Sequence, residues 1–225
     1  MYPTKEIMKY LIFSILLLAA SVHSANAQYL SSKDSDATAL ALLTKAGNAF
    51  NSSNSQVKFT LKSVFPGQEA QTNEGVLYRG GKSYRLELKD YHIISDGTTR
   101  WVYMKGRNEV NIYNESNGQD WISPQDFLQL HKSTDLVFTL VSKNPDGTAI
   151  IDVKPLKGKF DEYSKFTVGI KNGALNTIKA LSSDGSRQEM TINAVTTPTT
   201  WDANKLFTFQ SQSYPGVYVE DLRLD

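Results

Sequence analysis

The sequence predicts a mainly β protein, of the α+β class, built on an antiparallel sheet with one apolar face. Turn dipeptides recur at short intervals, including Gly80-Gly81, Asp96-Gly97 and Asn172-Gly173. Tight hairpin turns need glycine or asparagine, because their backbone adopts positive φ. The stretch from Glu74 to Tyr113 is interpreted as four short strands joined by glycine-bearing turns. Apolar and charged residues alternate at positions 84–89, so one face of this sheet must be covered.

The sequence also predicts two helices that can cover such a face. The first begins at Ser35 or Asp36, both good N-cap residues, and runs to about Asn51. Its apolar residues fall on one stripe: Leu40, Leu43 and Phe50. A second, short helix is expected after Ser123-Pro124, an N-cap residue followed by proline at the first helical position.

Further strands are expected on both sides of the 74–113 stretch, about ten in all. One strand spans 56–65 and ends at Pro66-Gly67. The others are separated by turns that contain glycine, and they span 135–142, 149–155, 163–171, 174–182 and 187–195. Asp202 is expected to cap a short turn, and Val217 and Val219 indicate a last edge strand.

Residues 1–27 have the pattern of a secretory signal peptide. Lys5 and Lys9 precede an apolar run from Leu11 to Ala20, and Ala25-Asn26-Ala27 provides a small-x-small cleavage site. The run is shorter than the ~20 apolar residues that span a bilayer, and an uncleaved anchor is the alternative. We therefore expect one exported domain at 28–225, of roughly 200 residues and able to bury a core.

The composition limits how this domain is held together and what it binds. The chain contains no cysteine, so packing alone must stabilise the fold, and no lipidated cysteine follows the signal peptide. Without residues 1–27, basic and acidic side chains are equal in number. This balance does not indicate nucleic acid or an anionic surface as a partner.

The sequence carries no pattern typical of an enzyme. After the signal peptide, His92 and His131 are the remaining histidines, and they lie too far apart for a helix-borne zinc motif. Neither a Gly-x-Ser-x-Gly elbow nor a glycine-rich phosphate loop occurs. We interpret both histidines as surface residues, and we expect no catalytic residues, no cofactor and no metal.

Aromatic and aliphatic side chains dominate the predicted strands instead. In a closed small barrel or a sandwich they would fill the core, the arrangement that composition alone favours. A strongly curved antiparallel sheet, with only short helices over its concave face, would leave an incompletely filled cavity.

Several segments, taken in order, resemble the periplasmic outer-membrane lipoprotein carrier family, the LolA-like proteins. Their order and spacing behind a signal peptide carry the resemblance, which runs from the first helix to the C-terminus. The segments are Glu74-Gly75-Val76-Leu77-Tyr78, Ser83-Tyr84-Arg85, Ser95-Asp96-Gly97, Arg100-Trp101-Val102-Tyr103, Phe166-Thr167-Val168, Phe207-Thr208-Phe209, and Pro215-Gly216-Val217 leading to Glu220-Asp221.

The resemblance implies an open half-barrel with short helices as a lid over the concave face. It implies a soluble, monomeric carrier in the periplasm that shields the acyl chains of lipoproteins and moves them to the outer membrane. An inner-membrane release transporter and an outer-membrane receptor are the implied partners. On this interpretation the cavity is lined by Phe59, Leu61, Tyr84, Leu86, Leu88, Trp101, Tyr103 and Ile112, and the lid contributes Phe127, Leu128 and Leu130.

One segment departs from the family pattern. Where the family has a basic residue followed by proline, linked to lid closure, this chain has Arg79-Gly80-Gly81-Lys82. Two glycines make the loop more permissive than a proline turn. We expect Arg79 or Lys82 to act as a latch that donates hydrogen bonds to carbonyls of the helix at 123–132.

Two other functions fit the same residues. A cavity of this kind accepts any long acyl chain, so the protein could carry another lipid or an acylated small molecule. A related sheet could also serve as an envelope-stress sensor domain that binds a protein partner.

Overall fold

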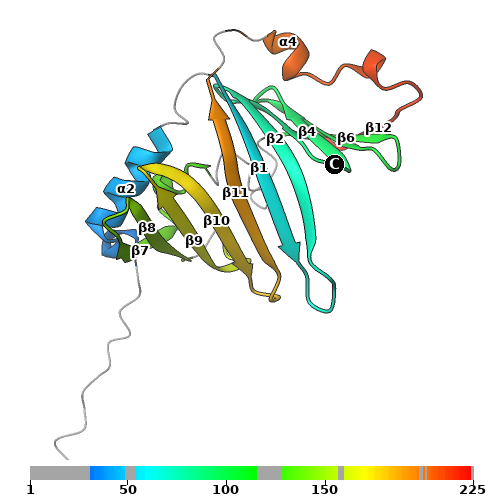
Figure 1. The fold of residues 1–225 in the computed structure, drawn as a ribbon. Helices are drawn as coiled ribbons and strands as arrows, with labels where there is room; N and C mark the ends of the chain where they lie inside the picture. The colour runs from blue at the N-terminus through cyan, green and yellow to red at the C-terminus, as the bar shows by residue number, and fades with distance from the viewer. Residues whose placement is uncertain are drawn as a thin grey trace, which may run out of the picture. The chain divides into compact units, whose positions relative to one another are not determined.

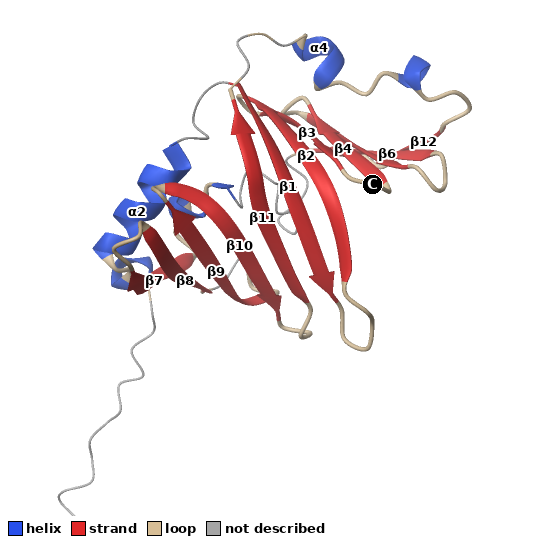
Figure 2. Ribbon diagram, viewed as in Figure 1, coloured by secondary structure: helices blue, strands red, loops and turns tan. Residues whose placement is uncertain are grey.

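Twelve strands form one strongly curved sheet that does not close into a barrel (Figures 1 and 2). The strand order is β12-β6-β5-β4-β3-β2-β1-β11-β10-β9-β8-β7, so β12 and β7 are the two edges and do not pair with each other. This computed structural model describes residues 31–48, 54–115, 128–156, 160–197, 200 and 202–223. The predicted open half-barrel is confirmed.

The elements follow the turn signals of the sequence closely. The strands are β1 (Asn54–Val64), β2 (Gln71–Gly80), β3 (Ser83–Glu87), β4 (Tyr91–Ser95), β5 (Thr99–Met104), β6 (Glu109–Asn114), β7 (Leu136–Lys143), β8 (Thr148–Pro155), β9 (Tyr163–Lys171), β10 (Ala174–Ser182), β11 (Arg187–Thr196) and β12 (Tyr218–Asp221). The helices are α2 (Ala37–Asn48), α4 (Ala203–Leu206) and the 3₁₀ turns η1 (Ser32–Asp34), η2 (Leu130–Lys132) and η3 (Ser211–Ser213).

The stretch from Glu74 to Tyr113 contains five strands or parts of strands, not the four that were predicted. The missed turn joins β3 to β4 at Leu88–Asp90 and contains no glycine. It is closed by a hydrogen bond from the Leu88 amide to the Tyr91 carbonyl (3.0 Å), and Lys105 Nζ donates to the Leu88 carbonyl (3.0 Å). A hydrogen bond from Lys105, which follows β5, thus helps to stabilise a turn that lacks glycine.

Neighbouring strands are antiparallel except at one edge, where β12 runs parallel to β6 with Val219 opposite Val110. Near the middle of the sheet β1 pairs with β11, and the register of this pair shifts between Lys58 and Phe59. Such a bulge increases the local twist and bends a sheet. This irregularity is therefore placed where it adds to the curvature of the half-barrel.

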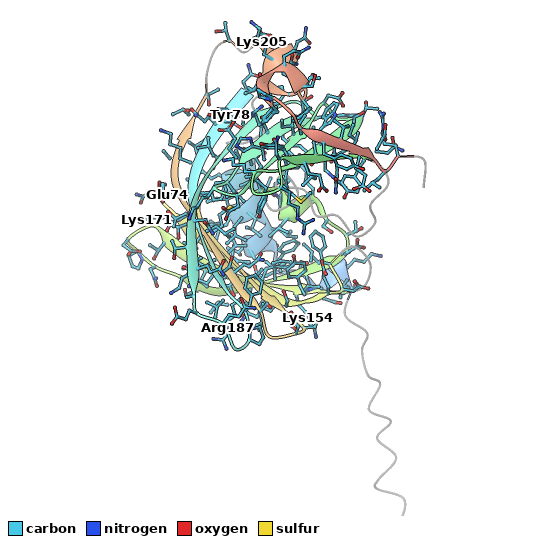
Figure 3. The ribbon with its side chains drawn as sticks, turned by 90° about the vertical axis from the view of Figure 1, so that its right-hand side faces the viewer. Glu74, Tyr78, Lys154, Lys171, Arg187 and Lys205 are labelled. Atoms are coloured by element: carbon cyan, nitrogen blue, oxygen red, sulfur yellow. The ribbon has the colours of Figure 1, made fainter. Side chains whose placement is uncertain are left out.

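Helix α2 packs inside the curve of the sheet, against β7, β9 and β10 (Figure 3). Asp36 caps the helix, because its Oδ1 accepts hydrogen bonds from the amides of Thr38 (2.7 Å) and Ala39 (3.0 Å). The buried residues of α2, among them Leu43, belong to the same apolar core as the inward side chains of β7–β10. The predicted cap and amphipathic stripe are confirmed, while Phe50 and Asn51 lie outside the described residues.

The segment after α4 covers part of the outer face of the sheet. Its Phe209 and Tyr214 rings stack (centroids 4.6 Å apart), and Tyr214 packs on Tyr103 of β5 (4.4 Å). Phe207 lies over Gly80, where any Cβ would come within 2.6 Å of the ring. Gly80 therefore gives room to an aromatic ring, while Gly81, with φ +63°, makes the hairpin turn.

Candidate functional site

A cavity of about 550 Å³ opens on the concave face of the half-barrel. Its wall is formed almost entirely by apolar side chains. They come from strands β1 to β5 and β9 to β11, from the β3–β4 turn and from Leu128. They are Val57, Phe59, Leu61, Leu77, Leu86, Leu88, Tyr91, Ile93, Val102, Met104, Leu128, Tyr163, Ile178, Ala180, Gln188 and Met190. Figure 3 shows the half-barrel turned by 90° from the view of Figure 1. The labelled charged residues Glu74, Lys171 and Arg187 lie at its periphery.

Strand register explains why these side chains meet. Val57, Leu77, Leu86, Ile93 and Val102 lie opposite one another in successive strands from β1 to β5. Directly paired residues point to the same face of a sheet, so these five form one continuous row, which we call the apolar row. The alternation at 84–89 therefore has the predicted outcome, with Leu86 and Leu88 inside and Arg85 and Glu87 paired outside (2.6 Å).

Gly75 shapes the floor of the cavity. It lies opposite Phe59, and a Cβ at this position would collide with the Phe59 ring and approach Leu88 Cδ2 to 2.8 Å. The absence of a side chain at Gly75 leaves room for the Phe59 ring over β2. A glycine inside a strand is thus used to place an aromatic ring in the cavity wall.

The described part of the lid borders the cavity at one side chain. Leu128 is buried and lines the cavity, whereas Leu130 is buried beside Leu43 of α2, Val168 and Leu175. Phe127, the third predicted lid residue, lies outside the described residues. The described end of the predicted lid therefore contacts both the side of the core that contains α2 and the cavity.

The structure divides the predicted cavity residues between the two faces of the sheet. Phe59, Leu61, Leu86 and Leu88 line the cavity. Tyr84 shares their face but is fully buried beyond the cavity, with its hydroxyl donating to Glu115 Oε1 (3.1 Å).

Trp101, Tyr103 and Ile112 lie on the outer face instead. In β5 the cavity side chains are Val102 and Met104, so the alternate residues Trp101 and Tyr103 must point outward, and Ile112 pairs with Trp101. The sequence of β5 is apolar on both faces, because the C-terminal aromatic segment covers its outer side. Alternation alone could not assign the inner face here.

The remaining lining residues were not singled out from the sequence. In β10 and β11 the alternation of apolar and polar residues can be recognised in the sequence. Only strand pairing, however, places Met190 opposite Leu61 and Ile178 opposite Met190. Tyr163 joins the wall through its packing on Phe166 (centroids 4.9 Å apart). These residues are close to the predicted cavity only in three dimensions.

A second row of inward side chains runs beside the apolar row and is largely polar. It contains Ser55, Arg79, Tyr84, Ser95, Arg100 and Tyr113, each paired with the next across β1 to β6, and we call it the polar row. Arg79 is 4% exposed and Arg100 6% exposed. Burial lowers the pKa of the Arg79 guanidinium from its ordinary value.

The two candidate latch residues therefore occupy different environments. Arg79 lies on the concave face in the polar row, whereas Lys82 is exposed in the β2–β3 turn. Residues 116–127, which include the first half of the predicted lid helix at 123–132, lie outside the described residues.

Neither histidine lies in the cavity. His92 is half-buried on the outer face, with Nδ1 3.4 Å from the Tyr214 hydroxyl, and its pKa is lowered by burial, Lys105 and Arg85 against the opposing effect of Glu87. The His131 ring packs on Gly47 of α2, and burial and Lys132 lower its pKa. Among the residues that the structure describes, no group of acidic, histidine or cysteine side chains could hold a metal ion. No helix within those ranges is long and apolar enough to span a membrane.

No protein-family model and no curated protein matches this sequence. Solved structures do match. An uncharacterized conserved protein from Thermus thermophilus has a TM-score of 0.53 at 10% identity, with 82% of this chain and 99% of that chain covered. A DUF1329 family protein from Desulfovibrio piger has a TM-score of 0.47 at 14% identity, covering 79% and 98%. A LolA superfamily protein from Nitrosomonas europaea has a TM-score of 0.43 at 14% identity, covering 76% and 97%.

At these identities the likeness concerns the fold alone. The chain shares its fold with the Thermus protein over nearly the whole of that protein.

Proposed function

We propose that the protein is a soluble periplasmic carrier that holds acyl chains in the cavity on the concave face of its half-barrel. The observation that carries this proposal is the cavity itself, about 550 Å³ in volume and walled by aliphatic and aromatic side chains. This volume lies within the roughly 300–1,000 Å³ typical of small-molecule sites. In line with the sequence resemblance, the first expected cargo is the acylated end of a lipoprotein on its way to the outer membrane.

Burial of apolar surface is sufficient for such a carrier, so it needs no catalytic residues. Burying each CH₂ group contributes about 0.8 kcal/mol, so a long chain cannot cross an aqueous compartment bare. An apolar cavity that stays open on one side shields the chain and still allows its release. An inner-membrane donor and an outer-membrane receptor would then load and unload it. In this scheme Arg79 is the better placed of the two latch candidates, because it shares the concave face with the cavity.

The cargo can be identified directly. The mature protein would be purified from the periplasm and its bound species determined by native mass spectrometry. Co-purified acylated lipoproteins are the expected result, and free lipids alone would favour a carrier of another acylated molecule. A protein that comes out with a bound protein partner and binds no acyl chain would contradict the proposal in favour of the sensor function.

The cavity face can be tested with a matched pair of variants. Leu86→Glu puts a charge in the cavity wall, where burial without a partner is costly, so affinity for a fluorescent long-chain fatty acid should fall about tenfold or more. Leu181→Glu makes the same change on the outer face, where Leu181 is 37% exposed and pairs with Lys165 and Arg187, and should leave binding unchanged. Circular dichroism would confirm that both variants fold. Unchanged binding by folded Leu86→Glu would show that the acyl site lies elsewhere.

A further inference from the structure

The polar row lies next to the apolar row along every strand from β1 to β5. Arg79 is two residues from Leu77, and Arg100 is two residues from Val102. Residues at i and i+2 share a face and are separated by only about 7 Å along a strand. A ligand whose apolar chain fills the cavity therefore has the polar row within reach of its polar end.

Ser55 gives this row an unusual property. It pairs with Arg79, is 0% exposed and shares the face of Val57 in the cavity wall. Among the described residues its hydroxyl has no hydrogen-bond partner. A buried hydroxyl without a partner costs about 1–3 kcal/mol, so such a group is rare unless a ligand or water uses it.

The charges of the polar row are predominantly positive. Of the six residues in the row, Arg79 and Arg100 are cationic and none is acidic, and the row contacts the carboxylate of Glu115, which follows β6. That carboxylate already accepts hydrogen bonds from the hydroxyls of Tyr84 (3.1 Å) and Ser95 (2.8 Å). Arg100 lies over the Tyr113 ring, 5.1 Å from its centroid, which fixes the position of the cation.

We propose that the polar row is a headgroup site, and that the preferred ligand is an acyl lipid with an anionic carboxylate or phosphate group. Arg100, Arg79 and the Ser55 hydroxyl would donate to the anion while the chain fills the cavity. Each guanidinium has five N–H donors, so it can bind an anion while keeping its other hydrogen bonds. This inference rests on the proposed function and selects within it the class of ligand.

The test compares ligands that differ only in the headgroup. Binding of palmitate and of palmityl alcohol to the mature protein would be measured by displacement of a fluorescent fatty acid. We expect palmitate to bind about tenfold more tightly than the alcohol, and Arg100→Gln to remove this difference while affinity for the alcohol is kept. Lysophosphatidic acid against monoacylglycerol gives the same comparison for phosphate, and the larger preference identifies the anion.

Ser55→Ala provides a variant that should not disturb folding. Because the hydroxyl has no partner in the described residues, its removal should leave the melting temperature equal or higher, yet lower the affinity for palmitate several-fold more than that for the alcohol. Equal binding of acid and alcohol by the unmodified protein, or a preference retained in both variants, would overturn the headgroup site and leave the acyl cavity standing. Failure to bind either ligand would refute the cavity function, and the headgroup site with it.

Discussion

At the scale of single residues, glycine and serine positions shape the concave face as much as the large side chains do. Gly75 lets the Phe59 ring lie across β2, and Gly80 gives the same freedom to Phe207 on the other face. Ser55 introduces a small hydroxyl where an apolar side chain would have been easier to bury. Each of the two glycines makes room for a ring that is distant in the sequence.

Substituting Gly75 tests the floor of the cavity. Gly75→Ala should lower the free energy of unfolding by about 1–2 kcal/mol, because overpacking costs about 1–3 kcal/mol and the loss of chain entropy in the unfolded state offsets only part of it. The displaced Phe59 ring should also weaken fatty-acid binding. Urea unfolding measures the first effect and fluorescence titration the second.

Gly106→Ala is the control for that experiment, because a Cβ there would meet no atom within 4 Å and the backbone does not require positive φ. Its stability should change by less than about 0.5 kcal/mol. If Gly75→Ala behaved in the same way, the Phe59 ring would not be constrained as described.

At the scale of elements, the C-terminal segment turns an exposed sheet face into a second packed layer. Phe207, Phe209 and Tyr214 lie over β2 to β5, and β12 then continues the sheet beyond β6. Ile94 and Val110 are fully buried beneath this layer and do not belong to the core around α2. The outer face of β3–β6 is therefore held by residues from the end of the chain.

His92 makes this outer layer sensitive to pH. Its neighbours are Arg85 and Glu87 from β3, Tyr103 and Lys105 from β5 and the following turn, and Tyr214 from the C-terminal segment. Burial, Lys105 and Arg85 lower its pKa, so between the folded value and the ordinary value near 6.5 the unfolded chain binds more protons. The free energy of unfolding should therefore be highest near pH 7, where His92 is mainly neutral in both states, and should fall as the pH decreases below about 6.5.

Urea unfolding at pH values from 7 to 5 measures this slope, above the range in which carboxylates titrate. His92→Gln should flatten it in part, and His131→Gln in part as well, because burial and Lys132 also lower the pKa of His131. If the double variant kept the full slope, neither histidine would be responsible for it.

At the scale of the whole molecule, the described part of the half-barrel leaves a cavity on its concave face. Helix α2 packs on part of the concave face of β7–β10, whereas the concave face of β1–β5 and β11, with nearby residues of β9 and β10, borders the cavity of about 550 Å³. The chain has no disulfide to compensate, because it has no cysteine. A ligand that fills the cavity should thus contribute to the stability of the entire fold.

Thermal unfolding tests this coupling. A ligand at a hundred times its dissociation constant adds about 2.7 kcal/mol to the free energy of unfolding, and about 1 kcal/mol shifts the melting temperature of a domain of this size by about 2–4 °C. Saturating palmitate should therefore raise the melting temperature by about 5–10 °C. At the same palmitate concentration the shift should be about halved or smaller in Leu86→Glu, whose affinity is expected to fall about tenfold or more, and retained in Leu181→Glu. An equal shift in both variants would place the ligand outside the cavity.

Local chemistry made much of the fold predictable. The spans of β9 and β10 were predicted to the residue, and the Asp202 cap was predicted as well, with Oδ1 accepting from the Lys205 amide at 3.2 Å. The turn at Leu88–Asp90 was missed because it lacks glycine and is held by Lys105 from another strand. The division into a signal peptide at 1–27 and one domain at 28–225 stays a prediction, because residues 1–30 lie outside the described part of the chain.

The sequence by itself determined the class of fold, most of the turns between strands and the alternation that makes one face apolar, because turn chemistry and side-chain period are local properties. Only the tertiary structure decided which face of β5 is the inner one, because Trp101 and Val102 are both apolar and the choice depends on what the C-terminal segment covers. It also decided that Ser55, Arg79 and Arg100 lie in one row beside the cavity. That row arises from the register of six strands, and register is a property of pairs of strands, which no single segment of the sequence contains.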